Sequence, residues 1–583
     1  MQSIKRIVKQ VLIVVVGVFT SLSLCLGIGL LLLQPSKPKI TDKTVLHVVL
    51  HGKVVEHAPN TLIQFLTGRE REQVIDLLVL REAIKRAQED KHIRGIYLEV
   101  DALKAGWASL ETIRNALLSF QKTGKFIVAY GEHYSQKTYY LASLADEVVL
   151  HPGGIFDFRG LSHTVFFYKT LLSKLEVSPE IFRVGKYKSA VEPFTRQEMS
   201  QASKRQNSEL LHAIYDHFLN TIATARGLKK AALQAMADAL LVVMPRDAHQ
   251  ANLVSQVGHS DTAEALIKIK LGLPEEASVN YISFGKYASF RKNVPSSKNN
   301  IAVLIAEGDI VDGMGTPGTV SAKSFAASLN TIRKDTSIKA VVLRINSPGG
   351  SALAADVLWR ELILTKAQKP VVASMSDIAA SGGYYLAAAC NRILAHPTTI
   401  TGSIGIFGLF FDVHALLSNK MGITTDVVKT GSSADLFENL GRPFSTYERE
   451  IIQKIINEGY RTFLERVAAG RGTNKAVLER VAAGRIWTGQ LAKEKGLVDE
   501  LGGLEEAIQV AAKLAGIEDV YTVSYWPKPP ALSVQVRSEW ETHARDETVL
   551  RMLQRSCPAF QHVQTLANMT GIQARLPYLV EVE

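Results

Sequence analysis

An internal repeat constrains the fold more than any other feature, because residues recur 245 positions further along the chain. The segment Tyr-Tyr-Leu-Ala begins at Tyr139 and again at Tyr384. The pair His-Pro begins at His151 and again at His396. A spacing that holds over so long a stretch is typical of a duplicated structural unit. The sequence therefore predicts two halves with the same fold.

Each half alternates short apolar runs with helical patterns. In the second half, the predicted strands are the apolar runs at 301–307, 340–345, 370–375 and 392–396. Alternation of this kind indicates an α/β unit with a largely parallel sheet. We expect a first repeat over residues 44–291, a polar linker over 292–300, a second repeat over 301–519 and a C-terminal extension over 520–583. The sequence assigns no function to the extension.

The N-terminus carries an uncharged apolar run that starts at Val11 and ends at Leu33. As a helix it spans roughly 34 Å, enough for a hydrocarbon core of about 30 Å. A cleaved signal peptide is the alternative, but its apolar region is ordinarily about 7–15 residues long and ends in small residues. Basic residues precede the run, which favours a cytoplasmic N-terminus. We therefore expect residues 1–43 to be a short stub and one transmembrane signal anchor, with the body outside the cytoplasm.

Composition excludes several classes of function. The three cysteines, Cys25, Cys390 and Cys557, are far apart, which excludes a disulfide framework and a Cys-rich zinc site. The net charge of +11 is spread along the chain and does not gather in Lys/Arg runs with interleaved aromatics, so no nucleic-acid partner is expected. Neither an HExxH nor a P-loop pattern occurs, and we expect no metal and no cofactor.

Two segments of the second half have the residues that nucleophilic catalysis needs. Ser381, in Ala-Ser-Gly-Gly, lies between a predicted strand and a predicted helix, where its hydroxyl and the Gly382 N–H can face an attacked carbonyl. The turn Asn-Ser-Pro-Gly-Gly at 346–350 can offer backbone N–H groups to an oxyanion. The simpler interpretations are a helix N-cap serine and an ordinary strand-to-helix turn.

The repeat favours the catalytic interpretation. At the 245-residue spacing, Ser381 corresponds to Gln136 and Gly382 to Lys137. A requirement of folding would occur in both halves, whereas these residues occur in one. No histidine has a convincing setting as the base. A lysine that burial keeps neutral can act instead, and the first half offers Lys186 and Lys188 within Gly-Lys-Tyr-Lys-Ser-Ala.

These motifs together resemble the signal peptide peptidase A (protease IV) family in its long, duplicated form. The resemblance covers nearly the whole chain and includes YKSAVEPF at 187–194, NSPGG at 346–350, ASGGYY at 380–385, TGSIGIFG at 401–408 and GRIWTGQLAKEKGLVDELGG at 484–503. It implies two tandem Clp protease/crotonase-like repeats. It also implies a serine endopeptidase that needs no cofactor and degrades remnant signal peptides with a Ser/Lys dyad.

The resemblance implies a role for each candidate residue. Ser381 would be the nucleophile, Lys188 rather than Lys186 the base, Gly350 and Gly382 the oxyanion donors, and Ser403 the residue that orients the lysine amine. It further implies a homotetramer in the bacterial inner membrane with its catalytic body on the periplasmic side. Two alternatives stay open: a crotonase-like acyl-CoA enzyme, and a non-enzymatic membrane scaffold in which Ser381 caps a helix.

Overall fold

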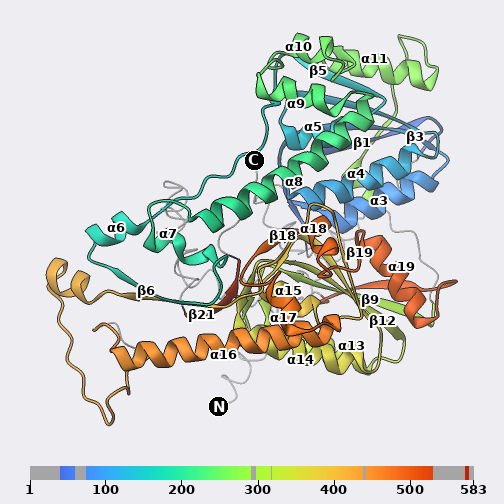
Figure 1. Cartoon of the computed structure of the whole chain (residues 1–583). Coiled ribbons are helices and arrows are strands. Elements are labelled where there is room, and N and C mark those ends of the chain that lie inside the picture. The colour runs from blue at the N-terminus through green and yellow to red at the C-terminus, as the bar shows by residue number, and fades with distance from the viewer. Residues whose placement is uncertain are drawn as a thin grey trace, which may run out of the picture.

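The computed structural model describes residues 40–58, 74–289, 297–316, 318–437, 442–528 and 571–576. The expected membrane anchor at 11–33 lies outside these residues, as do most of the linker and of the C-terminal extension. Within the described ranges, no helix combines the length and the apolar character needed to cross a membrane. Figure 1 shows the two halves as adjacent lobes, the first in blue to green and the second in yellow to orange.

The first half is built on a seven-stranded sheet in which every pairing is parallel. The strand order is β2-β1-β3-β4-β5-β7, with β8 also beside β1. These strands are β1 (Thr44–Val55), β2 (Val74–Asp76), β3 (Ile93–Lys104), β4 (Phe126–Tyr134), β5 (Glu147–Phe156), β7 (Gln256–Val257) and β8 (Tyr281–Ser283).

The second half has an eight-stranded sheet of order β18-β16-β14-β12-β9-β20, with β15 beside β14 and β19 beside β15. All its pairings are parallel except that of β16 with β18. The strands are β9 (Asn300–Glu307), β12 (Ile338–Ser347), β14 (Val371–Ala380), β15 (Arg392–Ala395), β16 (Ile400–Gly402), β18 (Ile486–Thr488), β19 (Glu500–Leu501) and β20 (Thr522–Trp526). The predicted α/β class with largely parallel sheets is therefore confirmed.

Helices recur at the spacing of the sequence repeat. The pairs α3 (Leu77–Glu89) with α13 (Ala322–Lys334), α4 (Trp107–Gln121) with α14 (Ala352–Lys366), and α8 (Gln201–Arg226) with α16 (Thr446–Arg471) are each offset by 245 residues at both ends. The other helices are α5 (Gln136–Ala142), α6 (Lys169–Lys174), α7 (Glu192–Thr195), α9 (Lys230–Asp238), α10 (Pro245–Gln250), α11 (Ser260–Leu271), α12 (Phe284–Ser289), α15 (Gly382–Ala387), α17 (Lys475–Glu479), α18 (Gly489–Glu494) and α19 (Leu504–Ala515), with short turns at Ser189–Val191 and Leu416–Lys420. The predicted duplication is thus present in the fold itself.

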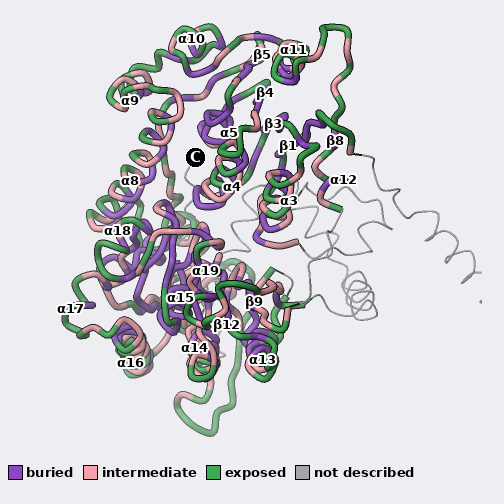
Figure 2. Tube along the Cα trace, turned by 90° about the vertical axis from the view of Figure 1, so that its right-hand side faces the viewer, coloured by how far each residue is buried: buried purple, intermediate pink, exposed green. Residues whose placement is uncertain are grey.

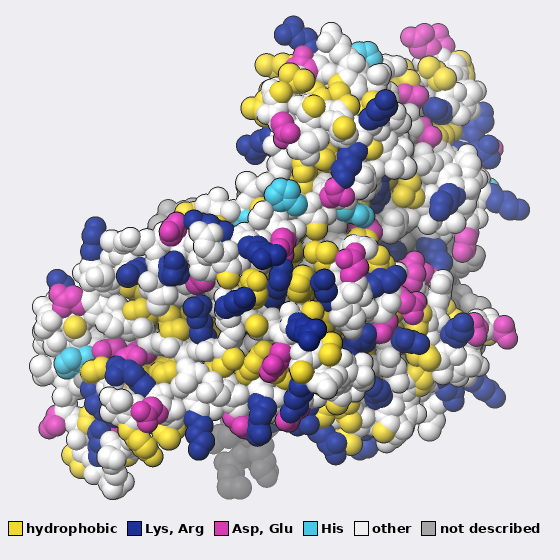
Figure 3. Space-filling view, viewed as in Figure 1, with side chains coloured by type: hydrophobic (Ala, Val, Ile, Leu, Met, Phe, Trp, Pro, Cys, Tyr) yellow, Lys and Arg dark blue, Asp and Glu magenta, His cyan; other side chains and the backbone are white. Residues whose placement is uncertain are grey.

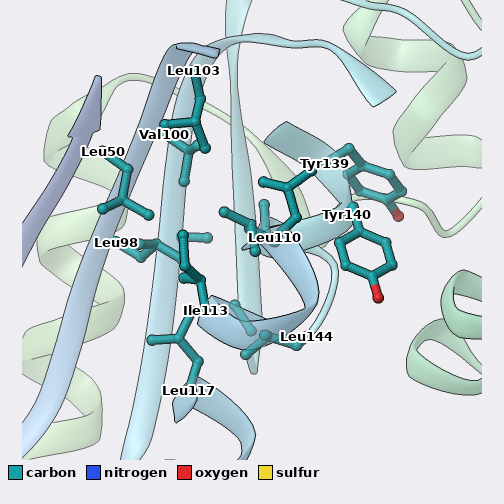
Figure 4. Close-up of a cluster of buried hydrophobic side chains, with 14 of the residues drawn as sticks. Leu50, Leu98, Val100, Leu103, Leu110, Ile113, Leu117, Tyr139, Tyr140 and Leu144 are labelled. Carbon is teal, nitrogen blue, oxygen red and sulfur yellow. The ribbon is translucent and has the colours of Figure 1, made fainter. Parts of the chain in front are cut away.

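Apolar helix faces cover the sheets. In α4, Leu110, Ile113 and Leu117 are spaced so that they share one face, and Figure 4 shows them directed toward Leu98 and Val100 of β3. All five side chains are buried, and each contributes about 1.5–3 kcal/mol by leaving water. Figure 2 shows the same arrangement throughout, with buried strands inside and exposed outer helix faces.

A third sheet joins the halves, and the sequence did not predict it. Its order is β11-β10-β13-β21-β17-β6, with β6 (Ser178–Arg183), β10 (Ile310–Val311), β11 (Val320–Ser321), β13 (Gly349–Ser351), β17 (Phe407–Asp412) and β21 (Gly571–Arg575). Strand β6 comes from the first half and runs antiparallel to β17 of the second. Figure 1 shows β6 reaching the side of the second lobe, where β21 also lies. This sheet carries a first-half segment to the second half.

A buried ion pair also fixes the two halves to each other. Glu56, just after β1, accepts hydrogen bonds from Arg344 Nε at 2.8 Å and Arg344 Nη2 at 3.0 Å. Both residues are 1% exposed. Removing one member of such a pair leaves an uncompensated buried charge and costs about 3–5 kcal/mol. The relative position of the halves is therefore rigidly specified close to the sheet that carries Ser381.

Candidate active site

Ser381 lies at the sharp junction between β14 and α15. Its φ of 53° is in the left-handed region that a non-glycine residue rarely occupies. The backbone is held there because the Ser381 N–H donates to Gly402 O at 2.8 Å. This strained turn lifts the hydroxyl away from the sheet, as in a nucleophile elbow.

The hydroxyl of Ser381 is not a helix cap. It accepts no hydrogen bond from the first turn of α15. At the corresponding junction of the first half, Ser135 Oγ does cap α5, accepting from Thr138 N at 3.2 Å. The N-cap interpretation is therefore wrong for Ser381, although it is right for a serine of the other half.

Lys188 lies beside Ser381. Its Nζ is 2.9 Å from Ser381 Oγ, 3.0 Å from Ser403 Oγ and 3.1 Å from Ser403 O. All three residues have no exposed surface. Lys186, by contrast, is an exposed residue whose Nζ lies 5.3 Å from the centre of the Tyr187 ring. The structure thus brings Lys188, Ser381 and Ser403 together and leaves Lys186 outside.

Close backbone approach buries Lys188. The Tyr187 N–H donates to Ala483 O at 3.1 Å. A Cβ on Gly484 would lie 2.6 Å from Lys188 Cβ, and a Cβ on Gly185 would lie 2.4 Å from Ala483 O. Both glycines are therefore needed for the two loops to meet. Sequence reasoning gave no role to Gly484, although it begins the run Gly-Arg-Ile-Trp-Thr-Gly.

Burial lowers the pKa of the Lys188 amine well below its ordinary value. Desolvation is the cause, because an ammonium group loses its hydration in this site. Among the described residues, no acidic side chain forms an ion pair with Lys188 that would offset this effect. The amine is thereby suited to be neutral and to accept a proton from the adjacent hydroxyl.

The turn at 346–350 comes close to the start of α15. A Cβ on Gly349 would lie 2.7 Å from Gly382 N and 2.1 Å from Ala574 O, and the φ of Gly349 is 97°. A Cβ on Gly350 would lie 2.0 Å from Ile310 O. No side chain fits at either position, so the backbone amides of this turn stay open to a carbonyl oxygen.

A carbonyl oxygen of the chain itself, that of Ala574, lies beside the backbone amides of this turn. Strand β21 pairs antiparallel with β13, with Gly350 opposite Ala574, and the Leu576 N–H donates to Pro348 O at 2.7 Å. In this register the Gly350 N–H faces the Ala574 carbonyl. The same oxygen lies 3.1 Å from the position of a Cβ on Gly382. Sequence analysis missed β21, which lies within the extension to which it assigned no function.

An apolar pocket of about 670 Å³ adjoins the site. Its lining includes Tyr385 of α15, Leu353 of α14, Ile406 and Ile455, and Ile572 of β21. Ile572 precedes Ala574 by two residues, so both side chains lie on the same face of β21. The pocket can therefore hold an apolar side chain of a peptide that binds as β21 does.

Comparisons with known proteins agree on one family. Residues 119–273 and 363–518 match Peptidase family S49. The chain is 35% identical to Protease 4 of Salmonella typhi over 551 residues, which cover 91% of this chain and 88% of that protein. It is 33% identical to the chloroplastic serine protease SPPA of Arabidopsis thaliana (82% and 70% covered). It is 35% identical to Protease 4 of Haemophilus influenzae (82% and 80% covered).

Proposed function

Because this chain belongs to peptidase family S49 and is a serine endopeptidase, we propose that Ser381 is its nucleophile and Lys188 its general base. The observation that carries the proposal is the 2.9 Å contact between Lys188 Nζ and Ser381 Oγ in a site without exposed surface. The neutral amine takes the hydroxyl proton as Oγ attacks a peptide carbonyl. Ser403 orients the amine through its two oxygen contacts.

The N–H groups of Gly350 and Gly382 hold the negative charge that develops on the attacked carbonyl oxygen. Donors fixed in place before the reaction are worth about 2.7–4 kcal/mol each in comparable sites. The Lys188 ammonium then protonates the leaving amine, and the same lysine, neutral again, activates the water that releases the acyl group. No step requires a group from outside the chain other than water.

The substrates are extended peptides with apolar side chains. A peptide between β13 and β17 adds a strand to the third sheet, so backbone hydrogen bonds bind it regardless of sequence. The apolar pocket at Tyr385 and Leu353 then favours hydrophobic segments. Remnant signal peptides have this character, and a putative signal peptide peptidase SppA of Enterococcus faecium is 33% identical over 204 residues.

The two alternatives fit the site less well. Acyl-CoA chemistry of the crotonase kind does not use a serine nucleophile beside a buried amine. A scaffold needs neither the strained φ of Ser381 nor a lysine with no exposed surface. The family assignment likewise favours peptide hydrolysis.

The remaining expectations from the sequence stay proposals. We propose that the chain is anchored in the bacterial inner membrane through residues 11–33, with its body on the periplasmic side, and that it forms a homotetramer. We also propose that residues 44–291 and 301–519 are tandem Clp protease/crotonase-like repeats. On the face shown in Figure 3, Lys and Arg side chains lie among acidic and apolar ones.

Cleavage of a fluorogenic apolar peptide by the full-length protein in detergent tests the dyad. We expect Ser381→Ala and Lys188→Met to lose activity by about 10⁴-fold or more. Lys186→Met is the matched control, because it removes an amine two residues away that is exposed, and it is expected to retain activity. Hydrolysis that survives Ser381→Ala, or that is lost equally in Lys186→Met, would refute the assignment.

A further inference from the structure

Strand β21 lies in the third sheet as a substrate peptide is expected to lie. It is antiparallel to β13 on one side and to β17 on the other. The Ala574 carbonyl faces the Gly350 N–H and lies close to Gly382. If these amides form the oxyanion site, the peptide bond at the position of attack joins Ala574 to Arg575. Each side chain of β21 then marks a subsite of the substrate groove, by which we mean the space between β13 and β17 that β21 fills.

The residue that follows this bond has a charged partner. Arg575 Nη2 is 2.9 Å from Asp309 Oδ2, and the Arg575 side chain is 10% exposed. Arg575 lies on the opposite face of β21 from Ala574 and Ile572. The Asp309 side chain is 26% exposed, so the ion pair is partly removed from water, with the arginine as its more buried member.

The backbone holds Asp309 firmly at the edge of the groove. Its carbonyl accepts from the Val320 N–H at 2.8 Å, which links it to β11. The next residue, Ile310, pairs with Gly350 of the oxyanion turn. Asp309 is therefore placed by the same strands that place Gly350, while its carboxylate contacts neither Ser381 nor Lys188. The neighbouring acid, Asp312, is engaged elsewhere, because Ser351 Oγ donates to it at 2.8 Å.

We propose that Asp309 is a specificity residue that selects a basic side chain immediately after the scissile bond. This inference rests on the proposed function and adds a requirement to it: an apolar peptide is cut best where a small residue is followed by Arg or Lys. Ala574 has no exposed surface in its subsite, which is consistent with a small residue before the bond. Hydrophobic segments flanked by basic residues meet both conditions.

A pair of peptides tests the selection. The first, Gly-Ile-Gln-Ala-Arg-Leu, is the sequence at 571–576, and the second has Gln in place of Arg. Both are given to the full-length protein, with mass spectrometry to locate the cut and kcat/KM as the readout. We expect cleavage between Ala and Arg, with a preference for Arg over Gln of about 10- to 100-fold, as for a hydrogen bond to a charged group.

Variants of Asp309 then separate a loss of the preference for a basic residue from a general loss of activity. Asp309→Asn is expected to remove the preference while it keeps the rate for the Gln peptide, and Asp309→Lys to favour a third peptide with Glu at that position. Asp312→Asn, the matched neutralisation, is expected to keep the preference. Equal cleavage of the Arg and Gln peptides by the wild type, or an equal loss of both in Asp309→Asn, would overturn the inference. Cleavage that survives Ser381→Ala would instead overturn the proposed dyad, so the two failures are distinguishable.

Discussion

A negative charge at position 403 is expected to move the pH dependence of catalysis. Ser403 Oγ is 3.0 Å from Lys188 Nζ, so Ser403→Asp places a carboxylate against the amine. The φ of Ser403 is 52°, a conformation that Asp and Asn accept more readily than other non-glycine residues. The carboxylate stabilises the ammonium form and raises the pKa of Lys188, opposite to the effect of burial.

The size of this shift follows from the distance. Two unit charges about 4 Å apart interact by about 4 kcal/mol at an effective dielectric constant of 20. One pKa unit corresponds to about 1.4 kcal/mol, so the upper limit is about 3 units, and desolvation of the new carboxylate reduces it. We expect a rise of about 1–3 units. Because catalysis needs the neutral amine, the rate at a pH below both ionisations falls about 10- to 1,000-fold and recovers as the pH rises.

The assay is the pH profile of kcat/KM for the fluorogenic peptide in wild type, Ser403→Asp and Ser403→Asn. The Asn variant is the control, because it has nearly the shape of Asp without the charge. Its ascending limb is expected to stay close to that of the wild type. If the ascending limb of the pH profile is identical in the Asp and Asn variants, or if it moves to lower pH in the Asp variant, Lys188 is not the base.

Three further predictions concern other parts of the structure. Ser135→Ala is expected to lose the side-chain cap of α5 and about 1 kcal/mol of stability, which calorimetry measures. Burial, aided by the nearby Glu56, raises the pKa of Glu307 to about 7. The folded protein therefore holds a proton that the unfolded chain releases, so the free energy of unfolding falls as the pH rises from about 4.5 to 7. The Glu307→Gln variant is expected to lack this fall, and thermal melts at pH 5 and pH 8 measure it. Deleting residues 571–583 removes β21 from the groove and is expected to raise kcat/KM for a short peptide; a lower value would contradict its place there.

The duplication and the parallel sheets could be predicted because both produce patterns that are visible in short stretches of the sequence. Runs such as 301–307 and 340–345 are apolar apart from Glu307 and Arg344, because β9 and β12 are buried on both faces. Helices α8 and α16 share a register because an insertion inside either half would have broken the 245-residue spacing. These signals depend on neighbours in sequence and need no knowledge of tertiary contacts.

The choice between Lys186 and Lys188 could not be made from the residues alone. Both lie in one short segment with small neighbours, and resemblance to a family was what favoured Lys188. Their difference arises from the loop that contains Gly484, which packs on Lys188 and leaves Lys186 exposed. A contact between segments so far apart in sequence has no local signature. Ser381 was easier to identify, because comparison of the two halves isolated it.

Strand β21 and Asp309 show the same limit more strongly. The sequence Gly-Ile-Gln-Ala-Arg alternates apolar and polar residues, but the alternation is short and does not identify the strands that would pair with it. It is a strand because β13 and β17 present unpaired backbone groups on both sides of it. The partner of Arg575 lies in the loop before β10, and an isolated acid in a loop is ordinarily a solvated surface charge.

The order of the third sheet implies that peptide binding and assembly of the catalytic groups are coupled. Without β21, the pairings leave two separate pieces, β11-β10-β13 and β17-β6. The first piece carries the oxyanion turn, and the second leads through β6 to Lys188. A peptide long enough to pair with both β13 and β17 therefore joins the strand that holds the oxyanion to the strand that positions the base. A peptide that pairs with β13 alone can occupy the oxyanion site without joining the two pieces, so lengthening a substrate toward its N-terminus should raise kcat and not only lower KM.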